Sequence, residues 1–513
     1  MSENCKKSIF KAGYIVTLCA LLAKMIGAAY KIPLINVLGA EGMGIYQLVF
    51  PVYAAAIALT SGSAGIIISR NVAKKRANGE LEEKAGACFL YTMIFSLLAA
   101  LFLSLFSSLI AKIQGFEQLK NCYFIISPAV FFVGMSSSLK GIFLGEGKIC
   151  FSSFCQLLEQ LTKAGVGLLL SSLLIKRSLY AAVAGAVAGV TAAETVSFVV
   201  CALYYFCGKE KYRLKMRFQK GYLKENSFII LHSLSLPLNA LIDGLIAVRL
   251  LLFFGNENAA ADYGLFSGSV NTLINMPIAV ALSFASATIP AISYFYALSS
   301  AQNIKESSSK SVKNVLFISC ACFFGLFMLS GEMIEILYPS FESGQAERAA
   351  LLLRICAVNT ITAPLCALYV AVLQALDRGN TCLKTSFLCL LLRVIAMIGL
   401  CFRAGIIGVA LSWVIFYALN MLINCAFHKK LLGRDKELVK NNMKILFCGV
   451  IMSLSLILPK MLIKDALLKI IICSAAGAGI YCALCFLTGA IGKRREERAV
   501  KTRKRSLKWR NSK

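Results

Sequence analysis

The chain has 513 residues, of which 58% are hydrophobic and only 15% are charged. A soluble domain is about half apolar and about a quarter charged, so this composition excludes an ordinary soluble protein and indicates an integral membrane protein. The net charge of +29 would suit a nucleic-acid-binding protein, but its distribution along the chain favours a different explanation.

Apolar stretches of about 20 residues recur along the whole chain, and each is long enough to cross about 30 Å of hydrocarbon. They predict fourteen transmembrane helices and an all-α membrane fold. We place these spans at 9–30, 45–69, 86–111, 122–144, 151–175, 179–206, 228–254, 263–289, 313–338, 350–375, 384–402, 405–427, 444–463 and 467–490.

The segment GAEGMGIYQLVFP (39–51) separates the first two spans and contains one carboxylate, Glu41, among glycines. Glycines allow a sharp reversal of the chain, and an exposed acid keeps such a turn in water. We interpret the segment as a short outer turn rather than a catalytic loop, with a gating role at the outer mouth of a transporter as the alternative.

Two pairs of similar segments indicate an internal repeat. EGMGIYQ (41–47) is similar to DYGLFSG (262–268), which places Asp262 where Glu41 lies in the first copy. GEGKICFSSFCQLLEQLTK (145–163) is similar to ALDRGNTCLKTSFLCLLLR (375–393), which aligns Lys163 with Arg393. Six spans separate the copies, so both would have the same orientation, as in transporters built from parallel repeats.

The repeat predicts a division of the chain into two six-helix lobes and two additional helices. We expect an N-terminal lobe at 1–207, a basic linker at 208–226, a C-terminal lobe at 227–428, the extra helices at 429–492 and a basic tail at 493–513.

Most of the 54 Lys and Arg residues fall in segments that would share one side of the membrane, among them the linker and the tail. This asymmetry follows the positive-inside rule and predicts that both termini are cytoplasmic. It also accounts for the net charge without nucleic acid as a partner. The tail could contact anionic membrane lipids.

Ionisable residues within the spans are the candidate functional residues, because each costs at least about 2.5–3.5 kcal/mol at mid-bilayer and usually faces a cavity or a partner. Cations outnumber acids among them. An excess of positive charge suits an anionic headgroup, since Arg and Lys both bind phosphate. The cations are Lys24, Lys31, Lys163, Arg249, Arg354 and Arg393, and the acids are Glu159, Glu194 and Asp243.

Some of these charges have structural alternatives. Lys24 lies about two turns deeper than Lys31, so we expect Lys24 to face a cavity, whereas Lys31 could be an interfacial anchor. Asp243 and Arg249 are six residues apart and lie on different faces of a helix, so each needs water or a partner on another helix. An interhelical salt bridge is the alternative to a functional role.

Gln156, Glu159, Gln160 and Lys163 form one polar stripe at helical spacing. Glu159 and Lys163 are four residues apart and could neutralise each other, so the stripe could be partly structural. Glu194 is a lone acid on a face of small residues, where packing against a partner competes with a role in proton transfer.

No motif for metal binding or enzyme chemistry is found. The twenty cysteines lie mostly in apolar stretches, where Cys behaves as a small hydrophobe, and no Cys or His spacing fits a metal site. P-loop, HExxH and GxSxG motifs are missing. We therefore expect neither an enzyme nor a bound cofactor, with Na⁺ or H⁺ as the candidate coupling ion.

The segments KMIGAAYKIPLINVLGAEGMGIYQLVFPVY, SRNVAKKRANGE, QLLEQLTK and LIDGLIAVRLL together resemble the stage V sporulation protein B-like branch of the polysaccharide biosynthesis family. That family belongs to the multidrug/oligosaccharidyl-lipid/polysaccharide (MOP) exporter superfamily, and the resemblance covers nearly the whole chain. It implies a V-shaped transporter in the bacterial plasma membrane that works by alternating access without an ATPase.

The resemblance also implies a lipid-linked oligosaccharide of the undecaprenyl-pyrophosphate type as substrate, most simply lipid II for peptidoglycan or spore cortex. Our hypothesis is that Lys24 and Arg249, with Lys31, Arg354 and Arg393, hold the pyrophosphate. The last two helices would offer a groove for the prenyl tail. Asp243 and Glu194, with Glu159, are the candidate coupling-ion or structural acids.

Three alternatives remain open. A drug–cation antiporter of the same superfamily would need acids in the N-terminal lobe. A membrane glycosyl-transferring enzyme would need a large polar outer loop, whereas the predicted outer loops are short. A scaffold that binds other cell-wall synthesis proteins leaves little mark on a sequence.

Overall fold

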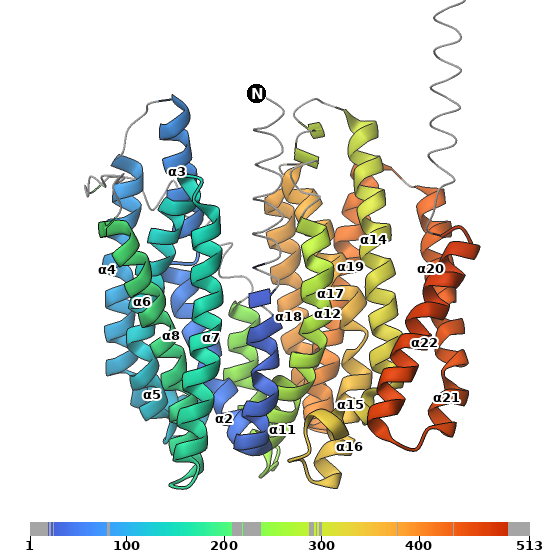
Figure 1. Cartoon of the computed structure of the whole chain (residues 1–513), viewed down its shortest axis with the longest axis horizontal. Coiled ribbons are helices and arrows are strands. Elements are labelled where there is room, and N and C mark those ends of the chain that lie inside the picture. Colours follow the sequence, from blue (N-terminus) through green and yellow to red (C-terminus); the bar gives the residue numbers. More distant parts are fainter. Residues whose placement is uncertain are drawn as a thin grey trace, which may run out of the picture. The chain divides into compact units, whose positions relative to one another are not determined.

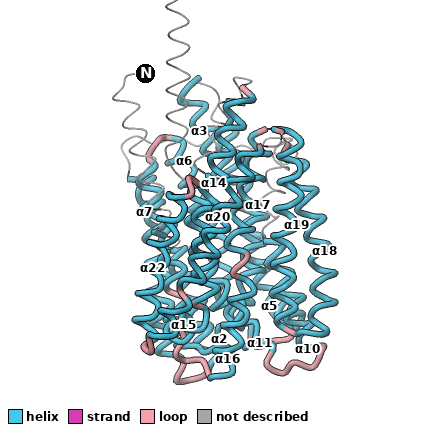
Figure 2. The backbone as a smooth tube through the Cα atoms, turned by 90° about the vertical axis from the view of Figure 1, so that its right-hand side faces the viewer, coloured by secondary structure: helices cyan, strands magenta, loops and turns pink. Residues whose placement is uncertain are grey.

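The structure is a computed structural model that describes residues 19, 22–23, 25–78, 83–207, 218, 237–286, 292–293, 295–296, 300–376, 378–433 and 435–490. Nearly all of these residues are helical and none of them forms a β-strand (Figure 2). The prediction of an all-α chain is confirmed for this part of the protein.

The helices are labelled in Figure 1. In chain order they are α2 (Lys31–Thr60), α3 (Ala64–Asn78), α4 (Glu83–Leu105), α5 (Ser107–Gln114), α6 (Leu119–Gly145), α7 (Ile149–Leu174), α8 (Leu179–Cys207), the π-helix η1 (Asp243–Ala247), α10 (Val248–Phe253), α11 (Ala259–Tyr263), the π-helix η2 (Gly264–Val270), α12 (Asn271–Ser286), α14 (Ala301–Met328), α15 (Ser330–Leu337), α16 (Ser343–Cys356), α17 (Asn359–Ala375), α18 (Gly379–Ala404), α19 (Ile406–Leu432), α20 (Lys436–Ser455), α21 (Ile457–Leu462) and α22 (Ala466–Leu487).

Twelve helical stretches in the described residues are long and apolar enough to cross a membrane. The prediction of fourteen spans is consistent with this number. The predicted span 9–30 lies largely outside the described residues. The predicted span 228–254 is described only from residue 237 onward, and this part is not among the twelve stretches. The other twelve predicted spans each overlap one of the twelve stretches. The chain is a multi-pass membrane protein.

The chain divides into two compact units that both combine separate stretches of sequence. The first unit contains the described residues up to Ala279, together with Leu337–Leu352 and Leu383–Phe416. The second contains Val280–Ile336, Leu353–Cys382 and the described residues from Tyr417 onward. The lobe boundaries expected from the repeat stay a prediction.

Within the first unit, α4, α6, α8 and α7 lie side by side (Figure 1), with α6 packed on α3, α4 and α8, and α8 packed on α7. Glycines allow these backbones to approach closely, as is common between membrane helices: a Cβ atom on Gly141 would lie 2.7 Å from the carbonyl oxygen of Gly65. Large apolar side chains such as Leu105 and Leu173 remain exposed, as expected for lipid-facing surfaces.

Between the first two predicted spans, helix α2 reverses at Gly39 rather than through a loop. Gly39 has φ +69°, a left-handed conformation that favours glycine, and helix resumes directly after it. The hydroxyls of Tyr30 and Tyr46 form a hydrogen bond, although sixteen residues of continuous helix would separate them by about 24 Å. The chain therefore folds back at Gly39, and Glu41 is an exposed residue of the returning helix.

The two copies of the first repeated segment pack against each other within the first unit. A Cβ atom on Gly44 would overlap the carbonyl oxygen of Ala260, and a Cβ atom on Gly264 would overlap the carbonyl oxygen of Ala40. The contacts are reciprocal, as in a local two-fold arrangement. Gln47 adds a hydrogen bond of 3.3 Å to the carbonyl oxygen of Ser267.

The acids of these two copies differ in their surroundings. Glu41 is exposed, as expected for a turn in water, whereas Asp262 is buried. Asp262 accepts hydrogen bonds from Arg348 at 2.6 Å and from the amide of Asn256 at 2.8 Å. The equivalence of the two acids in sequence therefore does not extend to their environments.

The second unit has a separate hydrophobic core between α14, α17, α20 and α22. The rings of Phe317 and Tyr481 stack with centroids 5.1 Å apart, and the Tyr481 hydroxyl donates a hydrogen bond of 2.9 Å to the Phe317 carbonyl oxygen. These contacts link α22 directly to α14.

We expect Gly44→Ala to destabilise the protein, because the added methyl group must displace the backbone of α11. Overpacking of this kind costs about 1–3 kcal/mol. Gly165→Ala is the matched control, since a Cβ atom there meets no atom within 4 Å. Thermal unfolding in detergent tests the difference, and equal melting temperatures for the two variants would contradict the close crossing.

Candidate functional site

The first unit contains a cavity of about 390 Å³ that combines charged and aromatic side chains. This volume lies near the lower end of the range for small-molecule sites, about 300–1,000 Å³. The cavity is lined by Phe50, Tyr53, Ala54, Ile57, Ala58, Gly62, Glu159, Gln160, Lys163, Val190, Glu194 and Pro237.

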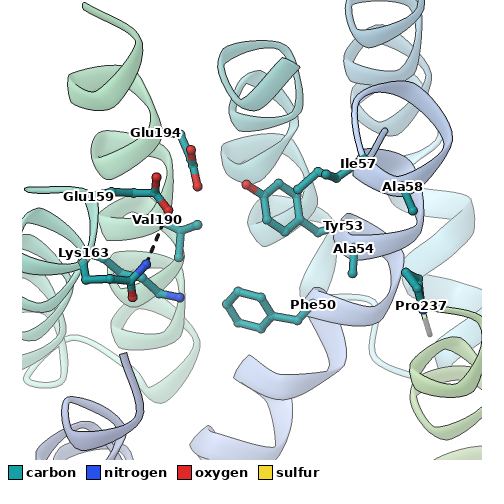
Figure 3. Close-up of a pocket in the computed structure, with 12 residues that line it drawn as sticks. Phe50, Tyr53, Ala54, Ile57, Ala58, Glu159, Lys163, Val190, Glu194 and Pro237 are labelled. Carbon is teal, nitrogen blue, oxygen red and sulfur yellow. Dashed lines mark hydrogen bonds between the residues drawn. The ribbon is translucent and has the colours of Figure 1, made fainter. Parts of the chain in front are cut away.

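The two walls of the cavity differ in chemistry (Figure 3). Glu159 and Lys163 from α7 and Glu194 from α8 make the charged wall. Phe50 and Tyr53 from α2 face them with aromatic rings. The fold-back at Gly39 brings the N-terminal part of α2 and the residues before it to the same region.

Lys163 lies between aromatic faces. Its ammonium group is 5.3 Å from the ring centroid of Tyr30 and 5.3 Å from that of Phe50, within the range of cation–π attraction. These rings stabilise the positive charge without neutralising it. Lys31 lies close enough for its own charge to interact with that of Lys163, so two cations share this part of the unit.

Glu159 is held by a lysine that the sequence analysis did not consider. Lys140 from α6 forms an ion pair with it, with Nζ and Oε2 3.0 Å apart, and both side chains are largely buried. The Gln160 amide donates a second, long hydrogen bond of 3.4 Å. The partner of Glu159 is therefore Lys140 rather than the expected Lys163, which leaves Lys163 to its aromatic neighbours.

Glu194 lies within hydrogen-bonding reach of Glu159, and the charges of Lys140 and Lys163 act on it as well. The phenol of Tyr53 points across the cavity toward Glu194 (Figure 3). Tyr53 is only 6% exposed, and its hydroxyl has no hydrogen-bond partner among the described residues. Such a buried unsatisfied hydroxyl is costly and marks a position where a polar group would be stabilised.

Arg393 and Asp243 form a second buried charge cluster in the first unit. Arg393 is fully buried and donates from Nη2 to the Asp243 carboxylate and from Nη1 to the Asn239 side chain at 2.8 Å. The Trp413 indole donates to the other Asp243 oxygen at 2.8 Å, and the Arg393 guanidinium lies 4.7 Å from the Trp413 ring centroid. The structure thus brings together two charges that the sequence analysis had assigned to different roles.

Asp243 is the first residue of the π-helix η1. A π-helical turn inserts an extra residue into the helix and often occurs at functional sites. In η1 the sequence DGLIA contains Gly244, where a Cβ atom would lie 2.7 Å from the ring of Pro51. The π-helical turn that begins at Asp243 therefore packs closely against α2 at Pro51, the residue after Phe50.

Two further predicted cations, Arg249 and Arg354, do not line the cavity. Arg249 is exposed and donates from Nε to the Ile113 carbonyl oxygen at 2.6 Å and from Nη2 to that of Lys112, so it binds the C-terminal carbonyls of α5. Arg354, in the second unit, donates to the Ser330 hydroxyl at 2.7 Å. Lys24 lies outside the described residues.

The site includes residues that the sequence did not single out. Lys140 lies in a stretch of serines near the end of a predicted span, and nothing near it in sequence marks it as a partner of Glu159. Trp413, one of only two tryptophans, was a stronger signal, since buried indole N–H groups usually find an acceptor. No three His, Cys, Asp or Glu side chains in the described part of the chain are grouped so that they could hold a metal ion.

Comparisons with known proteins assign the family. Residues 9–296 match the family described as Polysaccharide biosynthesis protein. The chain belongs to this family. It is similar to Stage V sporulation protein B of Bacillus subtilis, with 26% identity over 481 residues that cover 87% of this chain and 89% of the relative. It is also similar to the Lipid II flippase MurJ of the same organism, with 20% identity over 95% of this chain and 97% of the relative.

Solved structures show the same fold. A structure described as Lipid II flippase MurJ in an inward closed conformation aligns with a TM-score of 0.74, at 16% identity, over 93% of this chain and 98% of that one. An inward-facing MATE family transporter of the MOP superfamily aligns with a TM-score of 0.65, at 18% identity, over 83% of this chain and 99% of that one. The predicted MOP-type fold is confirmed, and because the relatives are transport proteins, so is the expectation that the chain is not an enzyme.

We expect Asp243→Asn to be strongly destabilising, because it leaves the buried Arg393 charge without its counter-ion. Breaking a buried ion pair from one side costs about 3–5 kcal/mol. The double variant Asp243→Asn with Arg393→Met removes both charges and should recover much of that loss. Thermal unfolding of the purified variants decides this, and a double variant no more stable than the single one would contradict the pairing.

Proposed function

We propose that the protein is a flippase that moves a polyprenyl-pyrophosphate-linked glycan, most simply lipid II, from the inner to the outer leaflet by alternating access. The membership of the polysaccharide biosynthesis family supports this class of transporter, as do relatives named for sporulation and for lipid II flipping. We further propose a bacterial plasma membrane location with cytoplasmic termini, on the basis of the positive-inside charge pattern.

The observation that carries the proposal is the pair Lys163 and Lys31 beside the cavity of the first unit. Lysine binds phosphate as a point charge, and the Lys163 ammonium group lies 5.3 Å from the ring centroids of both Tyr30 and Phe50. A cavity of about 390 Å³ would admit a pyrophosphate headgroup but not a whole lipid-linked oligosaccharide. In this proposal the glycan and the prenyl tail extend beyond the cavity.

We propose a smaller set of pyrophosphate ligands than the sequence suggested. Arg393 is fully buried and its charge is matched by Asp243, so we propose that it positions η1 rather than binds substrate. Arg249 binds the end of α5, and we assign it a structural role. Lys163 and Lys31 are the proposed pyrophosphate ligands, with Lys24 as a further candidate.

A drug–cation antiporter is the second candidate function. The presence of Glu159 and Glu194 in a cavity of the N-terminal half is the feature that such an antiporter would need, and MATE transporters share the fold. The three lysines around these acids favour an anionic substrate instead. Transport of a lipophilic organic cation by the purified protein, with no effect on lipid-linked glycans, would favour the antiporter.

We expect Lys163→Met to reduce flipping by about 10- to 100-fold, since a hydrogen bond to a charged group contributes about 1.5–3 kcal/mol. The readout is the amount of lipid II accessible at the outer leaflet in cells whose only copy of the protein is the variant. Lys440→Met is the matched control, because Lys440 is an exposed lysine of α20.

Depletion of the protein tests the function itself. If the amount of accessible lipid II, and of every other polyprenyl-linked glycan, is unchanged on depletion, the flippase proposal is wrong. Full activity of Lys163→Met and Lys31→Met would leave the function in place but exclude these lysines as ligands.

A further inference from the structure

We infer that Glu159 and Glu194 form a proton-binding site that takes up one proton when a pyrophosphate binds beside Lys163. The inference rests on the proposed function, and it adds a pair of carboxylates that offsets most of the positive charge of the lysines when the substrate is absent. The sequence left both Na⁺ and H⁺ as candidate coupling ions, and the geometry of this pair favours H⁺.

The first observation is that the two carboxyl groups lie close together on the charged wall of the cavity (Figure 3). Glu194 is within hydrogen-bonding reach of Glu159. Two ionised carboxylates have only acceptor atoms and repel each other, so the pair loses this repulsion and gains a hydrogen bond when one of them takes up a proton. The pair is therefore built to exist with one proton or with none.

The second observation is independent of the first and concerns Tyr53. Its buried hydroxyl points toward Glu194 and has no partner among the described residues. When both glutamates are ionised, the Tyr53 hydroxyl can donate a hydrogen bond across the cavity to one of their oxygens. A bound phosphate oxygen is equally such an acceptor, so the carboxylates and the substrate would draw on the same donor.

The titratable groups around the pair come from several of the described helices that pack against α7 and α8. Lys140 comes from α6, Lys163 from α7 and Tyr53 from α2, and Lys31 acts through Lys163. The thiols of Cys155 and Cys201, 3.6 Å apart, lie between α7 and α8 near Lys140. Two lysines next to the pair disfavour a metal cation at this position, whereas a proton can bind there.

The charge balance of the cavity then depends on the substrate. Three lysines and two ionised glutamates leave one positive charge when the cavity is empty. A pyrophosphate diester brings two negative charges and would leave the group with one negative charge. One proton on the glutamate pair makes the loaded group neutral, which is the state favoured in a membrane interior where net charge is costly.

The coupling is reciprocal by thermodynamic linkage. If the anion raises the proton affinity of the pair, the proton raises the affinity for the anion by the same factor. Couplings between sites are typically about 5- to 150-fold. Substrate affinity should therefore rise as the pH is lowered through the range in which the pair gains its proton.

The test uses the full-length protein in lipid nanodiscs and a short-prenyl sugar pyrophosphate diester, whose phosphates do not titrate near neutral pH. Calorimetry in buffers of different ionisation enthalpy measures the protons taken up per ligand bound. We expect close to one proton at a pH where the empty pair is ionised, and an affinity at least about 5-fold higher at low than at high pH.

Glu194→Gln mimics the protonated pair, so it should increase ligand affinity at high pH rather than reduce it. We expect this variant to bind the ligand at high pH as tightly as the native protein does at low pH, with no proton uptake. Glu332→Gln is the matched control, because Glu332 is also a carboxylate between two lysines, Lys460 and Lys469, but lies in the second unit. The control should keep both the proton uptake and the pH dependence.

The outcomes separate the two proposals. If the ligand binds but no proton is taken up and the affinity does not depend on pH, the proton site is wrong and the flippase proposal stands. An affinity that depends on Na⁺ instead of pH also overturns the proton assignment. If the ligand binds at no pH while the protein unfolds at its normal temperature, the proposed substrate class fails, and the proton site fails with it.

Discussion

Charge neutralisation inside the membrane is the constraint on which the rest of this structure depends. Each ionisable side chain in a span costs free energy unless it meets a partner or water. The protein solves this in two ways. Arg393 and Asp243 neutralise each other almost completely and are shielded from solvent, whereas Lys163 is stabilised by aromatic rings and keeps its charge available. The first arrangement suits a structural element and the second suits a binding site.

This difference appears at positions that the repeated segments align, Lys163 and Arg393. Both residues end related sequences. Among the described residues, Arg393 has a carboxylate as its direct ion-pair partner, Asp243 of the π-helix η1, and Lys163 has none. Arginine suits that role because its planar group can bind Asp243, Asn239 and the Trp413 ring at once. The two copies of this segment thus differ in role: Lys163 keeps a positive charge available, whereas Arg393 forms a neutral, structural ion pair with Asp243.

Close contacts between helix backbones provide the second constraint, because they fix where the aromatic residues lie relative to the charged ones. The reversal at Gly39 returns the second part of α2 beside the residues that precede Gly39, so that Tyr30 and Phe50 both reach Lys163. The contact of Gly44 with Gly264 fixes α2 against α11 and η2. A side chain at either glycine would separate these backbones. Because Phe50 and Tyr53 also lie on α2, such a change would move the aromatic wall of the cavity.

Hydropathy, turn residues and in-span charges are local properties, so the amino-acid sequence was enough to predict the membrane class, the positions of most spans, the family and the residues whose charge needs explanation. It also identified the polar stripe that carries Glu159 and Lys163. The partners of these charges could be identified only once the helices were placed in three dimensions: Lys140 for Glu159, Arg393 for Asp243 and the end of α5 for Arg249. Partners on other helices are set by packing and rotation of those helices, which no spacing within one helix encodes.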